Sequence, residues 1–293
     1  MSLIFNAECN YPLTFKHCFN ILKEQISEFN FVFTKEGIQI QQQNNIKNTD
    51  IDIFLEASAF QNYEIKTEEP IIIGVNILNV FKIFKIITVK DSGLQFRVIE
   101  SENFNGNTRD LYIDIINSKH AQTSTTRCNK IDLNLIQFPH FNLSDYHAVV
   151  DISSQDFQEI INKLKNLGNK NSKEQDTIIC YDNKYLSFIV DEGEYGSPSI
   201  ISKEIKNSVP CGFRNTTEDN ADNEVSNSAE LNTNIITNIN SVSYSISVKL
   251  FKLMELMRCT SLTTHVIMYI DNDKPLIIHY SVGILGYMMI RLN

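Results

Sequence analysis

The sequence predicts an α+β protein in which short helices cover one face of antiparallel sheets. Two observations support this class. In four short segments, apolar residues recur every three or four positions, and runs of alternating apolar residues separate these segments. The order of one strand, one helix and several more strands therefore recurs four times in 293 residues. With 42% hydrophobic residues, the chain can form a sizeable core and two domains.

The first half of the chain is expected to contain two helices. The first, at residues 12–26, carries Phe15, Phe19 and Leu22 on one face and begins with a proline, which suits a first helical turn. The second is expected at residues 74–87. The strands expected around these helices are FNFVF, GIQIQQ, IDIFLEA, GLQFRVI and DLYIDII.

The second half repeats this pattern. A helix is expected at residues 154–167, with Ser153 or Ser154 as its N-cap and Gly168 ending it. Another is expected at residues 247–259, with its apolar side chains mostly facing inward. The strands expected in this half are TIICY, YLSFIV, HVIMYI, PLIIHYSV and GYMMIRL.

Two segments interrupt the repeat and suggest the domain limits. Residues 117–146 are partly extended and partly irregular, which is typical of a connector between two halves. We therefore expect a first domain at residues 1–128, a connector at 129–143 and a second domain at 144–293. Residues 215–234 are rich in Asn, Ser, Thr and acidic residues, so a disordered surface loop is expected there.

Positive charge is concentrated in the four predicted helices. They carry nine basic and four acidic side chains, a net charge of +5, while the whole chain has a formal charge of −9. The rest of the chain therefore carries −14. In a single helix, lysines could simply solvate the outer face. Four such helices in an acidic protein favour a surface that follows a phosphate backbone without reading its sequence. The second helix shows this excess of positive charge most clearly, because Lys82 and Lys85 have no acidic residue in their segment.

Composition and motifs argue against several other classes. Six scattered cysteines without a C-x-x-C pair indicate reduced, mostly buried thiols. The N-terminal residues do not resemble a signal peptide, and no apolar run is long enough for a membrane helix. No phosphate-binding loop, nucleophile elbow or zinc-protease motif is present. His140 and His147 lack further ligands for a metal, and the DEGE run at residues 191–194 reads as a solvated turn. We therefore expect a binding protein without a cofactor or metal and without enzymatic activity.

Five collinear segments resemble a known family. They are FNAECNYPLTFKHCFNILKE, TKEGIQIQ, PIIIGVNILNVFKIFKII, KIDLNLIQFP and SLTTHVIMYIDNDKPLIIHYSV. Together they are similar to eukaryotic DNA sliding clamps of the proliferating cell nuclear antigen family. The resemblance covers nearly the whole chain and implies a DNA-clamp fold with two similar domains. It implies a ring of three chains, in which helices line a hole around duplex DNA and antiparallel sheets form the outer wall.

The resemblance also implies a DNA-facing set of basic residues. Five positions match the family directly, and four lie on the corresponding helices at positions that match only approximately. The five are Lys16, Lys23, Lys82, Lys85 and Arg258, and the four are Lys163, Lys165, Lys249 and Lys252. The third helix departs from the family, because Glu159 and Asn162 stand where arginines are usual.

A second implied site is a partner-binding groove beneath the connector. Its equivalents here are Gln43, Lys47, Ile136, Phe138, Pro139, Pro275 and Leu292. The expected ligand is a short peptide with aromatic and aliphatic anchors, carried by a DNA polymerase or a nuclease. Gln43 and Lys47 make the groove more polar than is usual in the family, which favours acidic residues beside those anchors.

The function implied by the resemblance is that of a DNA polymerase processivity factor in replication and repair. The expected protein is a homotrimer that does not bind a membrane. Two alternatives share the fold: a subunit of a heterotrimeric checkpoint clamp, and a clamp-like scaffold for viral late transcription. The departures indicate a divergent clamp, as from a large DNA virus or from an AT-rich genome. The implied location is the nucleus, or a cytoplasmic viral factory if the virus replicates there. Ring closure is expected to pair edge strands within residues 120–128 and 197–203.

Overall fold

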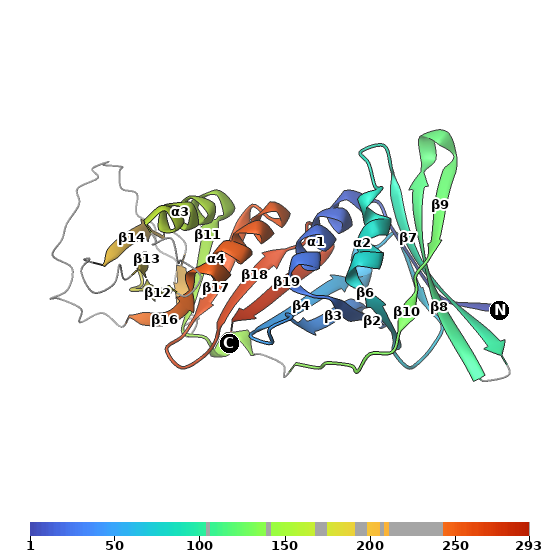
Figure 1. The fold of residues 1–293 in the computed structure, drawn as a ribbon, viewed down its shortest axis with the longest axis horizontal. Helices are drawn as coiled ribbons and strands as arrows, with labels where there is room; N and C mark the ends of the chain where they lie inside the picture. The colour runs from blue at the N-terminus through green and yellow to red at the C-terminus, as the bar shows by residue number, and fades with distance from the viewer. Residues whose placement is uncertain are drawn as a thin grey trace, which may run out of the picture.

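Four helices lie along one side of three antiparallel sheets (Figure 1). The structure, a computed structural model, describes residues 1–103, 106–138, 142–167, 175–190, 198–205, 208–210 and 243–292. Within these ranges the arrangement confirms the predicted α+β class, with its helices gathered on one face. The loop expected at residues 215–234 and Gly168 lie outside the described residues.

The described part of the first half contains two α-helices and ten strands. The helices are α1 (Pro12–Gln25) and α2 (Ile77–Lys85). The strands are β1 (Ser2–Cys9), β2 (Glu28–Phe33), β3 (Gly37–Gln43), β4 (Thr49–Glu56), β5 (Asn62–Ile65), β6 (Ile71–Asn76), β7 (Gly93–Asn103), β8 (Gly106–Asn117), β9 (Gln122–Arg127) and β10 (Lys130–Ile131).

The described part of the second half has the same layout. Its helices are α3 (Ser154–Leu167) and α4 (Leu250–Leu256), and the 3-10 helix η4 (Met257–Leu262) continues from α4. The strands are β11 (Ala148–Ser153), β12 (Asp176–Tyr181), β13 (Tyr185–Val190), β14 (Ser199–Glu204), β15 (Ser208–Pro210), β16 (Tyr244–Lys249), β17 (His265–Ile270), β18 (Leu276–Ser281) and β19 (Gly286–Leu292).

Side-chain caps explain where two of the helices begin. The side chain of Asn76 accepts a hydrogen bond from the backbone N–H of Leu78 at 3.0 Å, so α2 begins at Ile77 rather than at residue 74. Ser153 Oγ likewise accepts from the N–H of Asp156 at 3.0 Å, which confirms the predicted cap of α3. Both caps satisfy backbone donors that the first helical turn leaves free.

Gly74 lies in strand β6 and not in the predicted second helix. A Cβ atom at this position would come within 2.4 Å of the carbonyl oxygen of Ile131, the residue that pairs with Gly74 across β6 and β10. Glycine is therefore required for the start of the connector to pair with the sheet.

The predicted fourth helix is wrong at its N-terminal end. Residues 247–249 belong to strand β16, where Lys249 pairs with Asp176 of β12. Helix α4 begins only at Leu250. Alternating burial continues through Val248, and this pairing with β12 outweighs the helical spacing of the apolar residues.

One sheet runs through both halves of the chain. Its order is β10-β6-β2-β3-β4-β19-β18-β17-β11-β15, and the halves join where β19 pairs antiparallel with β4. The two smaller sheets have the orders β5-β1-β7-β8-β9 and β14-β13-β12-β16. Among the described strands, β9 and β14 are therefore sheet edges, as the sequence predicted.

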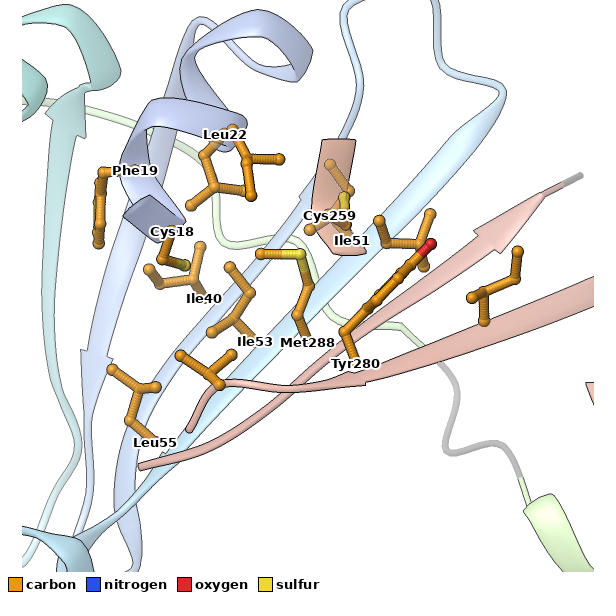
Figure 2. Close-up of a cluster of buried hydrophobic side chains, with 14 of the residues drawn as sticks. Cys18, Phe19, Leu22, Ile40, Ile51, Ile53, Leu55, Cys259, Tyr280 and Met288 are labelled. Atoms are coloured by element: carbon orange, nitrogen blue, oxygen red, sulfur yellow. The ribbon is translucent and has the colours of Figure 1, made fainter. Parts of the chain in front are cut away.

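The hydrophobic core is also continuous between the halves. Figure 2 shows Cys18 of α1 and Cys259 of η4 in one buried cluster with Ile53, Met288 and Tyr280. Farther into the first half, the rings of Phe19 and Phe84 join α1 to α2, with centroids 4.6 Å apart. Burying each such side chain contributes roughly 1.5–3 kcal/mol, so the halves pack as one body.

No helix in the described part of the chain is both long enough and apolar enough to cross a membrane.

Candidate functional site

Lys82 and Lys85 lie on the exposed face of α2, opposite its buried side. Both side chains are exposed, whereas Val80, Ile83 and Phe84 on the other side of the helix are buried. Neither lysine forms an ion pair with another described residue. Lys165 near the end of α3 is exposed in the same way. The helices α1 to α4 lie side by side and form one layer, called here the helix layer (Figure 1). These three ammonium groups leave a net positive charge on it.

Three further basic residues of the predicted DNA-facing set tie the helices together. Lys16 Nζ of α1 donates to the carbonyl oxygen of Ile87 at 2.6 Å, just beyond the end of α2. Lys23 Nζ lies 4.2 Å from the ring centroid of Phe81. Lys23 and Arg258 both approach Glu24, at 3.7 and 3.9 Å, and this carboxylate offsets part of their charge. They contribute less net charge to the helix layer than Lys82 and Lys85.

Two other members of the set form ion pairs within their own half. Lys163 Nζ lies 2.6 Å from Glu159, one turn earlier on α3. Lys249 is on strand β16 and lies 3.0 Å from Asp176. The departure of α3 from the family pattern therefore has a direct electrostatic effect, because Glu159 neutralises one of the two lysines of that helix.

Lys252 is buried, which contradicts its assignment as a DNA-facing residue. Only 5% of the surface of Lys252 is exposed. The ammonium donates to the carbonyl oxygen of Asn48 at 3.0 Å, in the turn between β3 and β4, and to Oγ1 of Thr49 at 2.6 Å, at the start of β4. Burial lowers its pKa. Lys252 therefore links α4 to the first half of the chain instead of facing outward with the other lysines.

The predicted partner-binding residues divide between two pockets. Phe138 lines one pocket, with a volume of about 260 Å³, on the outer face of the large sheet. Pro275 and Leu292 line a second one, of about 530 Å³, beside Lys252. Gln43 and Lys47 line neither pocket: Gln43 Nε2 donates to Asp50 at 2.9 Å, and Lys47 is exposed in a turn with φ 55°. Ile136 is half-buried in the connector, and Pro139 lies outside the described residues.

An ion pair occupies the floor of the pocket under Phe138. Arg291 of β19 bonds to Asp50 of β4, and its guanidinium carbon lies 5.9 Å from the ring centroid of Phe138. Asp52 and His279 line the same pocket. The sequence interpretation missed these four polar residues. Acids at alternate positions of the apolar run TDIDIF and the single arginine in GYMMIRL were the available signal.

Burial shifts the titration of two side chains in this pocket. It lowers the pKa of His279, which is therefore neutral at pH 7, and the Nδ1 atom of this histidine has no hydrogen-bond partner among the described atoms. Burial and the nearby charges of Asp52 and Glu56 raise the pKa of Tyr287 to about 12. The pocket is thus a partly desolvated polar site with aromatic walls.

A hydrogen-bonded network anchors the end of the connector next to these pockets. Tyr146 Oη donates to the carbonyl oxygen of Pro275 at 2.8 Å. Asp271 Oδ2 lies 2.7 Å from His147 Nδ1 and 3.0 Å from Lys274 Nζ. Burial alone would raise the pKa of Asp271, but these contacts and the backbone N–H of Asp273 outweigh it and hold the pKa at about 2. The network fixes the turn that presents Pro275.

The described residues contain no cluster of three or more side chains suited to hold a metal ion. His147 is engaged with Asp271, and His140 lies outside the described residues.

Family models match both halves of the chain. The model for the N-terminal domain of proliferating cell nuclear antigen matches residues 4–137, and the model for its C-terminal domain matches residues 141–292. The limits predicted for the two domains, at residues 128 and 144, remain predictions.

Individual proteins of the same family are also similar to this chain. Proliferating cell nuclear antigen 2 of Plasmodium falciparum is 27% identical over 158 residues, or 53% of this chain and 57% of that protein. DNA polymerase sliding clamp 2 of Saccharolobus solfataricus is 29% identical over 164 residues, or 52% of this chain and 66% of that protein. The matches thus span less than two thirds of both relatives. The crystal structure of the Entamoeba histolytica antigen has a similar fold, with a TM-score of 0.72 at 17% identity over 99% of this chain and 98% of that one.

The low pKa of Asp271 predicts a pH-dependent loss of stability. Because its pKa is below the usual 3.8, the carboxylate contributes stability above about pH 4 and loses it as the pH falls through about 2. Asp271→Asn should lower the free energy of unfolding at pH 7 by on the order of 1–2 kcal/mol. The difference from the parent should shrink toward pH 2 in urea titrations. Asp273→Asn, two residues away and exposed, is the control, and an equal loss in both variants would contradict the role of the network.

Proposed function

The chain belongs to the proliferating cell nuclear antigen family of DNA sliding clamps, and we propose that it forms a ring that encircles duplex DNA and holds a DNA polymerase on its template. The observation that carries this proposal is the exposed pair Lys82 and Lys85, on the helix layer of an otherwise acidic chain and without an ion-pair partner among the described residues. In the proposed ring this layer faces the DNA.

Lysine suits such a sliding contact. Its ammonium is a flexible point charge that attracts phosphates without reading bases. The basic residues that tie the helices together, Lys16, Lys23 and Arg258, place further positive charge beside Lys82 and Lys85. The acidic remainder of the chain repels DNA from the other surfaces. We propose a scaffold of this kind, in which the protein tethers an enzyme and performs no reaction itself.

The proposed subunit contact joins β9 of one chain to β14 of the next. Both are edge strands of the described sheets, and an unpaired edge favours pairing with another strand. Because the two edges lie in different halves of the chain, the contact is head-to-tail and closes into a ring when the rotation between subunits permits it.

Self-assembly is the first test of this proposal. The purified protein should have three times the 33.7 kDa mass of the chain in analytical ultracentrifugation. Ile201→Pro in β14 should shift it to the monomer, because proline disrupts strand pairing. Circular dichroism checks that the variant stays folded. A parent protein that is monomeric at every concentration would contradict the homotrimer, and would favour a heterotrimer with related chains.

The second test concerns the helix layer. Lys82→Glu combined with Lys85→Glu should weaken association with duplex DNA on the order of tenfold at moderate salt and reduce its salt dependence, because fewer counterions are released. Fluorescence anisotropy with a labelled duplex measures this. The matched control is Lys35→Glu with Lys66→Glu, which changes the net charge equally away from the helices. Equal losses in the two double variants would show only an effect of net charge and overturn the assignment.

The third test concerns partner binding beneath the connector. We propose that Phe138 contacts an apolar anchor of a peptide from a DNA polymerase or a nuclease. Phe138→Ala should then cost more than about 2 kcal/mol, or roughly thirtyfold in affinity, as is usual for a buried aromatic at an interface. Isothermal titration calorimetry with such peptides measures the loss. Leu135→Ala is the control, since Leu135 is an exposed connector residue that does not line the pocket. Unchanged binding by the Phe138 variant would place the partner surface elsewhere.

A further inference from the structure

The side chain of Asn30, on β2, holds the connector to the large sheet. Asn30 is buried, and its Nδ2 atom donates to the carbonyl oxygen of Asn134 at 3.1 Å. Residues 132–138 belong to no helix or strand, and this is the one hydrogen bond that the structure shows within that described stretch. Beneath the connector a buried amide without a partner would be costly, so the bond favours the docked connector.

Gly74 leaves room for this contact. Asn30 pairs with Gly74 across β2 and β6, and Gly74 pairs with Ile131 across β6 and β10. A Cβ atom at Gly74 would lie 3.1 Å from Oδ1 of Asn30 and 3.1 Å from Cγ of Leu133, which is closer than ordinary van der Waals contact. The glycine therefore lets the connector lie close enough to β2 for the Asn30 side chain to reach it.

The connector between Asn134 and Phe138 is a short tether. Phe138 follows Asn134 by four residues, and four residues of extended chain span at most about 14 Å. Strands in a sheet are about 4.8 Å apart, so this length covers about three strand spacings. The strands that follow β2 in the sheet are β3, β4 and β19, and their residues line the pocket under Phe138. The bond from Asn30 therefore limits how far the Phe138 ring can move from this pocket.

We propose that Asn30 is a positioning residue for partner binding and acts through Phe138. Asn30 does not line the pocket under Phe138, so it does not touch a peptide bound there. Its hydrogen bond instead raises the fraction of molecules in which the connector is docked with Phe138 over the pocket. The measured affinity for a peptide is scaled by that fraction. This inference rests on the proposed function, because it requires that a partner peptide contacts Phe138.

Peptide titrations in two backgrounds test this role on the full-length protein. The probe is a fluorescein-labelled synthetic peptide with one aliphatic and one aromatic anchor, the tightest binder of a panel. Asn30→Ala should weaken its binding about fivefold, as expected for the loss of one hydrogen bond. In protein that already carries Phe138→Ala, the same change should weaken binding less than about twofold, because Asn30 then has no ring to position. A general loss of stability would lower the affinity equally in both backgrounds.

A tryptophan reporter follows the connector without any peptide. The chain contains no tryptophan, so Phe138→Trp places a single indole at the pocket. Adding Asn30→Ala should raise the acrylamide quenching of this indole about twofold, because the connector is undocked for more of the time. The matched control is Gln42→Ala, which removes a 2.7 Å hydrogen bond from an amide side chain to the carbonyl oxygen of Glu28 but leaves the connector contact intact. This control should change neither the quenching nor the peptide affinity.

Three results would overturn the proposal. They are unchanged quenching in the Asn30 variant, an equal loss of affinity in both Phe138 backgrounds, and equal effects of the Asn30 and Gln42 variants. If no peptide of the panel binds the parent protein, the role in partner binding is overturned as well. Assembly mass and DNA association, measured on the same samples, separate these failures from failure of the proposed function, because the helix layer and the β9–β14 contact lie outside residues 132–138.

Discussion

The antiparallel pairing of β4 with β19 is the contact on which the rest of the structure depends. It joins a strand near the start of the chain to the last strand and turns two similar halves into one sheet of ten strands. Since the helices of both halves cover the same face of this sheet, the pairing brings all four into one layer (Figure 1). The buried cluster around Cys18, Cys259 and Tyr280 reinforces the junction from the helix side (Figure 2).

The same junction also creates two polar sites. The pairing sets Arg291 opposite Asp50, and it places Leu292 next to the turn that Lys252 binds. Residues more than 200 positions apart in sequence thus form the floor of one pocket and the wall of the other. Positive charge remains on the helix layer, while mixed charges lie beneath the connector. One architectural contact accounts for the separation of two surfaces that differ in charge.

Local patterns predicted the elements well but not every side-chain role. The spacing of Phe15, Phe19 and Leu22 marked a buried helical face, and alternating apolar residues marked the strands of the large sheet. The resemblance to the clamp family implied that Lys252 faces DNA, yet its partner Asn48 lies about 200 residues away, in the β3–β4 turn. The ion pair of Asp50 and Arg291 was missed for the same reason. The spacing of apolar residues shows which face of a helix or strand is buried. A buried polar contact depends instead on which distant element packs against that face.

The proposal that a closed ring surrounds DNA is tested most directly by the topology of the complex. A ring can thread over the open end of a linear duplex and is trapped when bulky groups then block both ends. The protein should remain on such DNA through a high-salt wash that screens charge contacts, and it should be released when a nuclease cuts the duplex. Release by salt alone before cutting, or retention that cutting does not change, would contradict encirclement.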